Sequence, residues 1–597
     1  MDGKKLEYKG EAALEEIEKL TEKADEVQES ILREILIQNG QTEYLSKYIK
    51  GSKDVKEFKY CVPVITYKDM YPYIQRIANG EDSSLITGRP ITEMLCSSGT
   101  SAGEPKLMPS INEDLDRRTF IYNLVMPIMN QYISGLDEGK AMYLYFVKEE
   151  MSTPCGLPAR TVLTSYYKSK HFKCRARDSF NDFTSPDQAI LCKDSDQSMY
   201  CQLLSGLVYR HQVLRIGAVF ASALLRAISF LERNWVHLCN DIRNGELDPM
   251  ITDPECRSCM SMILSSPNPS LADEIEEICS RPSWKGILCL LWPRTKYIEA
   301  VVTGSMAQYV PSLKYYSERK LPLVCTMYAS SECYFGVNLK PLSDPAEVSF
   351  TLMPNMCYFE FIPLGENGTL LMDVDEEEKV PIHKLVDLVH VRRGCYYELV
   401  VTTFAGLYRY RIGDVLQVTG FHNQAPQFRF ICRRNVVLSI DNDKTNEEDL
   451  HKSISTAKKL LEPYNAILVE YTSYAETLVV PGHYVLYWEI LHHSSVVNHN
   501  QTPLDAEVFQ ECCIAVEEEL DYIYRRCRTH DKSIGPLEIR VVEPGTFEAL
   551  MDLFIGQGGS INQYKTPRCI KSNAALMLLN SHVKASFFSA RDPVWIP

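Results

Sequence analysis

The stretch A-M-Y-L-Y-F-V, from Ala141 to Val147, is short, apolar and aromatic, which is typical of a buried β-strand. Similar stretches follow at Leu323 to Tyr328 and at Glu398 to Thr403. From about Asp196 to Arg243, between the first two, apolar residues are spaced as in buried helices. Strands that alternate with helices predict an α/β core.

Outside this core, the sequence predicts an amphipathic helix before it and a smaller domain after it. From Leu14 to Leu36, apolar residues recur mostly at steps of three and four. After the polar run at residues 441–449 come a strand at 484–490, a helix from about 506 to 525 and a strand at 537–542. We therefore expect a large N-terminal domain over residues 1–433, a hinge at 434–446, and a small mobile α+β domain over 447–597.

Length and charge narrow the class of protein. A chain of 597 residues is too long for one core. The net charge of −15, with no basic tail or stripe, argues against nucleic acid as a partner.

The N-terminus has no apolar secretory segment, and the most apolar stretch, Ile216 to Leu231, is interrupted by Arg226 and too short to cross a bilayer. We expect a cytoplasmic monomer with no membrane contact.

The 20 cysteines are scattered along the chain, which predicts reduced thiols within cores rather than disulfides. Cys256 and Cys259 form the one Cys-x-x-Cys spacing typical of a metal site. Because no second pair lies at a suitable distance, this spacing favours helix packing over structural zinc.

A loop rich in hydroxyls, C-S-S-G-T-S-A-G-E-P-K from Cys96 to Lys106, suits phosphate binding. Glycines let backbone N–H groups approach an anion, the hydroxyls add donors, and the lysine adds positive charge. It is not a Walker A loop, since Leu107 follows the lysine. Because such a stretch is also common in plain surface loops, the pattern alone leaves both interpretations open.

Three further segments share this chemistry. Y-A-S-S-E, from Tyr328 to Glu332, follows a strand and would place hydroxyls and a carboxylate at the ligand edge of an α/β sheet. Asp414 comes after a strand-like stretch, beside a glycine, where a carboxylate suits two ribose hydroxyls. Lys565 lies in a late loop, Q-Y-K-T-P-R. Each alone is compatible with a structural role.

The order of these segments resembles that of the adenylate-forming enzymes, whose large domain is of the firefly luciferase type. The order is the phosphate loop, Tyr-x-Ser-x-Glu, Arg-x-Gly-Asp, the hinge and the late lysine. Residues 97–109, 328–338 and 408–434 resemble the plant Gretchen Hagen family of auxin-inducible acyl acid amido synthetases, over essentially the full chain. Ala102-Gly103 and Lys106 to Pro109 resemble the branch that acts on indole-3-acetic acid. Pro105 is a departure, since the family pattern would have Arg there.

The resemblance implies a ligase that uses ATP and Mg²⁺ to form an acyl-adenylate from indole-3-acetic acid. An amino acid such as aspartate then attacks it, which lowers free auxin. The residues that would hold ATP or AMP are Ser97, Ser98, Thr100, Ser330, Ser331, Glu332, Tyr358, Asp414, Arg433 and Lys444. Glu332 would also help to hold Mg²⁺, and Lys565 would swing in while negative charge builds at the α-phosphate.

By the same resemblance, the acid would lie in a mostly apolar aromatic slot. Its residues would be Arg118, Val162, Leu163, Met327, Ala329 and Tyr334, with Tyr358 beside them. Arg118 could orient the carboxylate bidentately. The alternative is a solvated ion pair with Asp114 or Asp116 on the same helix.

Other functions stay open at this point. They are a ligase that passes the acyl group to coenzyme A, an amido synthetase for jasmonate or a benzoate, and a non-catalytic adenylate-binding protein. The presence of Lys106, Glu332, Asp414 and Lys565 disfavours the last. The sequence does not determine which amino acid is used or how strictly the acid is selected.

Overall fold

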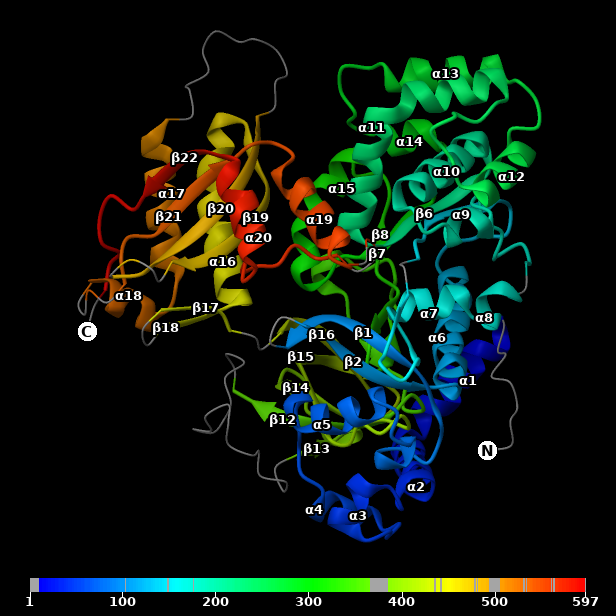
Figure 1. Ribbon diagram of the computed structural model, residues 1–597, viewed down its shortest axis with the longest axis vertical. Coiled ribbons are helices and arrows are strands. Elements are labelled where there is room, and N and C mark those ends of the chain that lie inside the picture. Colours follow the sequence, from blue (N-terminus) through cyan, green and yellow to red (C-terminus); the bar gives the residue numbers. More distant parts are fainter. Residues whose placement is uncertain are drawn as a thin grey trace. The chain divides into compact units, whose positions relative to one another are not determined.

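The computed structural model describes residues 10–101, 104–147, 150–175, 177–365, 385–433, 436–440, 443–476, 481–492, 505–529, 534–559 and 564–595, with Val479, Lys532 and Ile561. The chain forms two compact units, one within residues 1–431 and the other within residues 432–559 and 564–597 (Figure 1). Both units mix helices and strands, as the sequence predicts.

The first unit begins with short helices. They are α1 (Glu11–Glu22), α2 (Ala24–Asn39), α3 (Glu43–Ile49), α4 (Val55–Cys61) and α5 (Tyr67–Ala78). The single helix expected from Leu14 to Leu36 is wrong, because Lys23 leaves the helical region at φ −118° and ψ 33°. The break lets the two helices pack on different surfaces. Gln28 of α2 donates to the Pro354 and Cys357 carbonyls at 2.6 and 2.7 Å, whereas α1 packs against α6.

A parallel sheet follows, ordered β3 (Lys140–Leu144), β6 (Val213–Phe220), β7 (Tyr297–Val301) and β8 (Leu323–Val324). The strand predicted from Ala141 to Val147 is confirmed as far as Leu144, where β3 ends. The helical region expected from Asp196 to Arg243 is wrong in its middle, where β6 separates α10 (Ser195–Val208) from α11 (Ala221–Asn244). A strand buried on both faces is a continuous apolar run, which periodicity does not distinguish from a buried helix.

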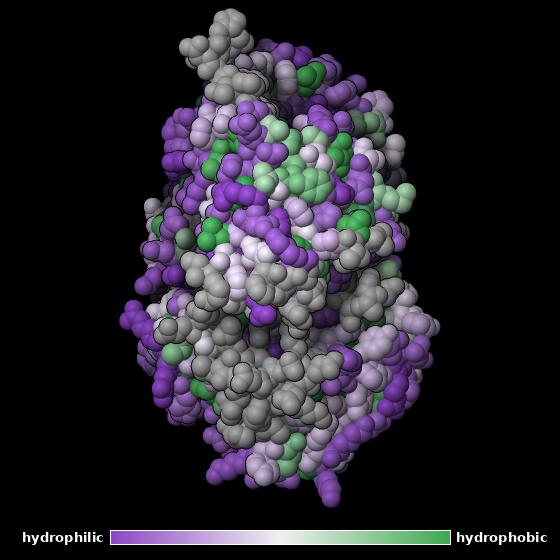
Figure 2. Space-filling model, turned by 90° about the vertical axis from the view of Figure 1, so that its left-hand side faces the viewer, coloured by the Kyte–Doolittle hydropathy of each residue, from purple (hydrophilic) through white to green (hydrophobic). Residues whose placement is uncertain are grey.

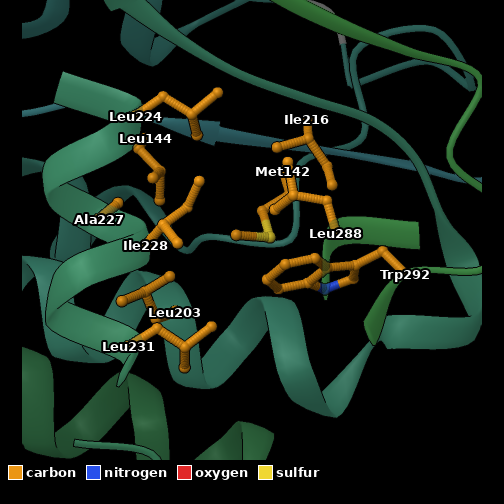
Figure 3. Close-up of a pocket in the computed structure, with 10 residues that line it drawn as sticks. All are labelled: Met142, Leu144, Leu203, Ile216, Leu224, Ala227, Ile228, Leu231, Leu288 and Trp292. Atoms are coloured by element: carbon orange, nitrogen blue, oxygen red, sulfur yellow. The ribbon is translucent and has the colours of Figure 1, made fainter. Parts of the chain in front are cut away.

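A small apolar cavity lies where this sheet meets α10 and α11 (Figure 3). Its walls include Met142 and Leu144 of β3, Ile216 of β6, Leu203 of α10 and the indole of Trp292. The volume is about 10 Å³, which is at the lower limit for a single water molecule. We interpret it as a packing gap and not as a substrate site.

The largest sheet of the first unit is antiparallel in every pairing described. Its order is β13 (Val386–Asp387), β12 (Tyr358–Leu364), β14 (Tyr396–Thr402), β15 (Tyr410–His422), β16 (Ala425–Arg433), β11 (Phe350–Leu352), β10 (Tyr334–Val337) and β9 (Met327–Ala329). The strand predicted at Glu398 is confirmed. The strand predicted from Leu323 to Tyr328 is two strands, since β8 belongs to the parallel sheet and β9 to this one.

A third sheet carries the candidate phosphate loop. Its order is β2 (Glu104–Ile111), β1 (Ile91–Ser101), β5 (Pro158–Arg160) and β4 (Met151–Ser152). The remaining helices of this unit are α6 (Glu113–Asn130), α7 (Val162–Lys168), α8 (Lys170–Lys173), α9 (Asp187–Leu191), α12 (Pro254–Ile263), α13 (Pro269–Cys279), α14 (Ile287–Leu291) and α15 (Val310–Tyr316).

The second unit contains a hairpin and a sheet with helices on both faces. The hairpin pairs β17 (Val436–Ile440) with β18 (Asp443–Asn446). The sheet is ordered β19 (Ala466–Glu476), β20 (His483–His492), β21 (Glu538–Val542) and β22 (Val583–Phe588). The helices are α16 (Glu447–Ala457), α17 (Ala506–Glu519), α18 (Tyr522–Thr529), α19 (Thr546–Gly556) and α20 (Asn573–Ser581).

Alternation along β20 explains the two faces of this sheet. Tyr484, Leu486 and Trp488 belong to one core with α16 and α17, while Val485 and Tyr487 belong to another with α19 and α20. The helix expected to run from 506 to 525 is wrong in its second half. Leu520 is extended, and α18 begins after it.

Three further observations concern the cysteines, the apolar character of the helices and the surface. All 20 cysteines are free thiols, as predicted, but Cys155, Cys174 and Cys395 are exposed and so do not lie within cores. None of the helices in the described part of the chain has both the length and the apolar character of a membrane span. Hydrophilic side chains predominate among the described residues on the face shown in Figure 2, which agrees with a charged fraction of 24%.

Candidate active site

The candidate phosphate loop is the hairpin between β1 and β2. Ser97, Ser98 and Thr100 lie in β1, but their side chains fall outside the described residues. At the base of the hairpin, the hydroxyl of Tyr67 in α5 accepts a hydrogen bond from the Leu107 N–H at 3.0 Å. The Lys106 ammonium lies 5.4 Å from the centre of the same ring, so α5 fixes the lysine that ends the loop.

The second candidate segment is the tight turn from β9 to β10. The Ser330 N–H donates to the Cys333 carbonyl at 2.9 Å, and the Glu332 N–H donates to the Ser330 hydroxyl at 3.3 Å. Ser330, Ser331 and Glu332 are all partly exposed. The turn therefore holds two hydroxyls and a carboxylate close together, with solvent access.

Asp414 is buried inside β15, which corrects its expected position after a strand. The register of β14 against β15 shifts between Glu398 and Val400, and Gly413 in this bulge has a φ of +82°, which favours glycine. The bulge brings Asp414 to the Tyr328 hydroxyl, which donates to its Oδ2 at 2.6 Å. The structure thus joins the second and third candidate segments.

Tyr358 occupies a different environment. It is buried in β12, and its hydroxyl donates to Asp387 at 2.9 Å. Lys59 pairs with the same carboxylate at 2.6 Å. Burial, with the negative charges of Glu360 and Asp387, raises the pKa of Tyr358 well above its usual value. A nucleotide contact by its hydroxyl would therefore compete with Asp387.

Arg118 has the most distinctive surroundings of the predicted acid-site residues. Its side chain lies in α6 with 6% of the residue exposed, and Nη2 donates to the Ser110 hydroxyl at 3.1 Å. Nη1 is buried and has no hydrogen-bond partner among the described residues. The solvated ion pair is wrong, because Asp114 pairs with Arg117 at 3.1 Å and Asp116 pairs with His171 at 2.7 Å.

Tyrosines surround this part of the site. The hydroxyls of Tyr122 and Tyr334 are 2.9 Å apart, and the Tyr122 ring lies 4.5 Å from that of Tyr166. Tyr167 stacks on Tyr145 at 4.8 Å. Burial raises the pKa of each of these tyrosines above the usual value, so their hydroxyls stay protonated near neutral pH.

The other acid-site candidates lie on α7, which carries Tyr166 and Tyr167, and on β9, which pairs with the strand of Tyr334. Val162 and Leu163 are buried at the start of α7, which Thr161 caps by accepting the Thr164 N–H at 3.3 Å. Ala329 faces Tyr334 across the β9–β10 pair and is exposed, and Met327 is half-buried. Sequence reasoning missed Tyr122, Tyr166 and Tyr167. Tyr122 lies four residues after Arg118, so helical spacing would have placed both on one face.

The remaining candidates lie at or beyond the end of the first unit. Arg433, at the end of β16, is half-buried. Lys444 pairs with Ser439 in the β17–β18 hairpin, although its side chain lies outside the described residues. Lys565 is exposed, and buried residues follow it. Their contacts with ATP stay predictions.

A metal site made by protein alone needs a group of donor side chains that converge on one point. Among the described residues, the one such group contains Cys192, Asp253 and Cys256, and Glu332 and Cys259 are not part of it. A single carboxylate is nevertheless a normal protein contribution to Mg²⁺ in nucleotide enzymes, where phosphates and water supply the other ligands. Glu332, partly exposed, fits that role.

Comparison with known proteins agrees with this architecture. The solved structure of the "GH3.15 acyl acid amido synthetase" matches with a TM-score of 0.89 and 47% identity, over 99% of each chain. Three family models match in order: "GH3 family N-terminal domain" at 13–323, "GH3 family central domain" at 350–433 and "GH3 family C-terminal domain" at 448–574. The chain belongs to the GH3 family.

Two relatives from Arabidopsis thaliana match along the full chain. The protein named "Putative indole-3-acetic acid-amido synthetase GH3.9" is 71% identical and is covered completely, as is this chain. The protein named "Indole-3-acetic acid-amido synthetase GH3.17" is 57% identical, with 98% of each chain covered. The family resemblance and the predicted fold class are confirmed.

Proposed function

We propose that the protein is a carbon–nitrogen ligase that joins indole-3-acetic acid to an amino acid through an acyl-adenylate, with ATP as the second substrate. The observation that carries the proposal is the buried Arg118, whose Nη1 has no hydrogen-bond partner among the described residues and whose charge interacts with the buried Tyr334. The names of the two relatives support the choice of acid.

Arg118 provides the binding energy for the carboxylate. A buried guanidinium nitrogen without a partner is costly, and a carboxylate oxygen would satisfy it with a charge-assisted hydrogen bond. Ser110 holds the other terminal nitrogen, so the group is already oriented before the acid arrives. Tyr122, Tyr166 and Tyr334 offer aromatic faces and edges to an indole ring.

The first half-reaction forms the adenylate. A carboxylate oxygen attacks the α-phosphorus of ATP, and pyrophosphate leaves. Asp414, oriented by Tyr328, accepts hydrogen bonds from the ribose hydroxyls, and the serines of the β9–β10 turn contact the nucleotide. Glu332 would hold Mg²⁺, which offsets phosphate charge when bound. Lys565 contributes positive charge as pyrophosphate departs.

The second half-reaction forms the amide. The free amine of the amino acid attacks the acyl carbon, AMP leaves, and a proton is lost from nitrogen. Aspartate is the acceptor we test first. A cytoplasmic location and a monomeric state stay predictions.

A different acid is the second candidate. The solved structure named "AtGH3.15 acyl acid amido synthetase in complex with 2,4-DB" shares 47% identity with this chain. A family member with another ligand makes jasmonate and benzoate necessary comparisons. They would use the same Arg118 but fit the tyrosine-lined slot differently.

The deciding experiment measures pyrophosphate release with indole-3-acetate, phenylacetate, jasmonate and benzoate, using aspartate as acceptor, and identifies each product by mass. We expect the highest kcat/KM for indole-3-acetate, with slower turnover of phenylacetate, because apolar fit discriminates by only about 1–3 kcal/mol per missing group. A leading jasmonate or benzoate would change the acid. An acyl-CoA product would replace the amide, and no pyrophosphate with any acid would end the enzyme proposal.

A further inference from the structure

The chain just after Lys565 is fixed to strand β19 of the second unit. The Ser473 N–H donates to the Arg568 carbonyl at 3.0 Å, and the Ile570 N–H donates to the Ser473 carbonyl at 2.8 Å. The Thr472 hydroxyl also donates to the Pro567 carbonyl. Residues 567–570 therefore lie along β19 like a short additional strand.

A buried carboxylate, that of Glu470, lies at the start of this contact. Its Oε2 accepts a hydrogen bond from the Thr566 hydroxyl at 2.9 Å, and its Oε1 accepts one from Arg568 Nη1 at 2.8 Å. Oε1 also accepts the Tyr471 N–H at 2.9 Å. One carboxylate thus holds the residues on both sides of Pro567, and the first of them directly follows Lys565.

Arg568 strengthens this arrangement. Its Nη1 also donates to the Tyr471 carbonyl at 2.7 Å, and its guanidinium lies 4.3 Å from the centre of the Tyr471 ring. The side chains of Arg568 and Glu470 are only 4% and 6% exposed. Burying such a pair costs desolvation energy, so it is weak evidence for added stability and better evidence for a defined local geometry.

Lys565 directly precedes the residues that make these contacts. Lys565 is exposed, whereas Thr566 beside it is buried and bonded to Glu470. On its other side, the ring of Tyr564 lies 6.2 Å from that of Phe554 in α19. The hydrogen bonds of Glu470 to Thr566 and Arg568 therefore fix the chain directly after Lys565.

We propose that Glu470 is a positioning residue for Lys565, which acts on adenylation by fixing Thr566 and Arg568. The inference rests on the proposed role of Lys565 in the first half-reaction. It adds to that role a residue of β19, which lies far from Lys565 in the sequence. A charged group displaced by about 1 Å can lose about 100-fold in rate, so the effect of these contacts should be visible in kinetics.

The chain offers a matched control in Glu489. It is the register partner of Glu470 on the neighbouring strand β20 and is also buried. Its oxygens accept the N–H groups of Gly545 and Phe547, both at 2.9 Å, at the start of α19. Glu489→Gln therefore changes a buried carboxylate of the same sheet whose hydrogen bonds described here go to the start of α19 and not to Thr566 or Arg568.

The experiment compares Glu470→Gln, Glu489→Gln and Lys565→Ala in the full chain. Adenylation is followed by ATP–pyrophosphate exchange with indole-3-acetate. Transfer is followed as amide formed from supplied indole-3-acetyl-adenylate and aspartate. We expect Glu470→Gln to slow exchange about 10-fold or more, with transfer within about twofold of the parent. Glu489→Gln should change neither rate by more than about twofold.

Several outcomes would overturn the inference. Equal slowing of both steps by Glu470→Gln, or the same loss in Glu489→Gln, would assign Glu470 a purely structural role. If Lys565→Ala slows exchange and Glu470→Gln does not, the positioning role fails while the proposed function stands. If Lys565→Ala leaves exchange unchanged, the role of Lys565 itself is wrong.

Two further variants keep the test decisive if Glu470→Gln does not fold. Thr566→Val removes one donor to the carboxylate and should slow exchange selectively, by a smaller factor. In the Lys565→Ala background, Thr566→Val should add no further loss, because a positioning residue has no effect without the group that it positions. An additive loss contradicts the proposal.

Discussion

Two buried arginines of the first unit have opposite surroundings. Arg409 donates through Nε and Nη2 to Glu360 at 2.9 and 2.8 Å, and through Nη1 to the carbonyls of Lys59 and Val62 at 2.8 and 2.9 Å. Arg118 has the Ser110 hydroxyl on one terminal nitrogen and, among the described residues, no hydrogen-bond partner on the other. The hydrogen bonds of the first guanidinium are therefore largely made within the protein, whereas we propose that the second binds the carboxylate of the acid.

The difference teaches how to separate a structural charge from a binding charge. Arg409 joins the end of α4 to β12, and it keeps a left-handed backbone with φ +46°, which surrounding contacts must stabilise. Arg118 has no ion pair with a distant element in the described part of the chain. Removing the first should damage folding, and removing the second should damage binding.

The largest effect is expected for Arg409→Ala. Breaking a buried pair leaves Glu360 charged and unpaired, which costs about 3–5 kcal/mol of unfolding free energy. Urea denaturation, followed by a probe in the first unit, measures this change. A loss below about 1 kcal/mol would show that burial and pairing do not distinguish the two arginines.

The second prediction concerns the half-buried imidazole of His451, which lies 3.3 Å from the Tyr471 hydroxyl. Burial, helped by the positive charges of Arg568 and Lys458, lowers the pKa of His451 to about 4. Between that value and the ordinary pKa near 6.5, the unfolded chain binds more protons than the folded one. The second unit should therefore lose stability as pH falls from about 6.5 to 4, by at most about 3 kcal/mol.

His451→Gln provides the control for this pH dependence. Its stability should vary less across the same window, because the amide does not titrate. Urea denaturation at several pH values measures both proteins. Identical pH profiles for the parent and the variant would contradict the assignment of the effect to His451.

The third prediction concerns Arg118→Met. We expect it to weaken acid binding by about 1.5–3 kcal/mol, roughly 10- to 100-fold, since a charge-assisted hydrogen bond is lost. ATP affinity should not change, and unfolding free energy should change much less than for Arg409→Ala. Acid and ATP titrations measure both affinities. Arg117→Met, which removes the neighbour paired with Asp114, should leave acid affinity unchanged.

The smallest effect is expected at Asp414, where Tyr328 already occupies one oxygen. Asp414→Asn should weaken ATP binding by about 1–2 kcal/mol, because ribose hydroxyls lose a charged acceptor. Isothermal titration with ATP tests this. Unchanged affinity together with unchanged turnover would remove Asp414 from the nucleotide site.

The sequence predicted the fold class and the order of candidate segments well, because strand composition and motif order are local properties. It failed where tertiary contacts decide. The apolar run of β6 resembles a buried helix, and the break at Lys23 depends on the different surfaces that α1 and α2 contact. Asp414 lies within a strand because a bulge at Gly413 continues the pairing beyond it.

The candidate site was predictable only in part for a similar reason. The sequence singled out Arg118. It did not show whether Asp114 pairs with Arg117 or with Arg118, and therefore not whether Arg118 is solvated or buried. Tyr122, Tyr166 and Tyr334 lie in three separate elements, and no local pattern connects them. Motif order identifies residues that resemble a family, whereas packing determines the walls of a pocket.

The tyrosines around the candidate acid site should also give an intrinsic spectroscopic signal that reports on acid binding. Closely packed phenol rings such as Tyr122 with Tyr166 and Tyr145 with Tyr167 couple their electronic transitions, which gives circular dichroism in the near ultraviolet. Because burial raises the pKa of Tyr166 to about 12, this signal should persist in mildly alkaline buffer. An aromatic acid that enters among these rings would change their coupling, so its arrival can be followed without label, nucleotide or turnover.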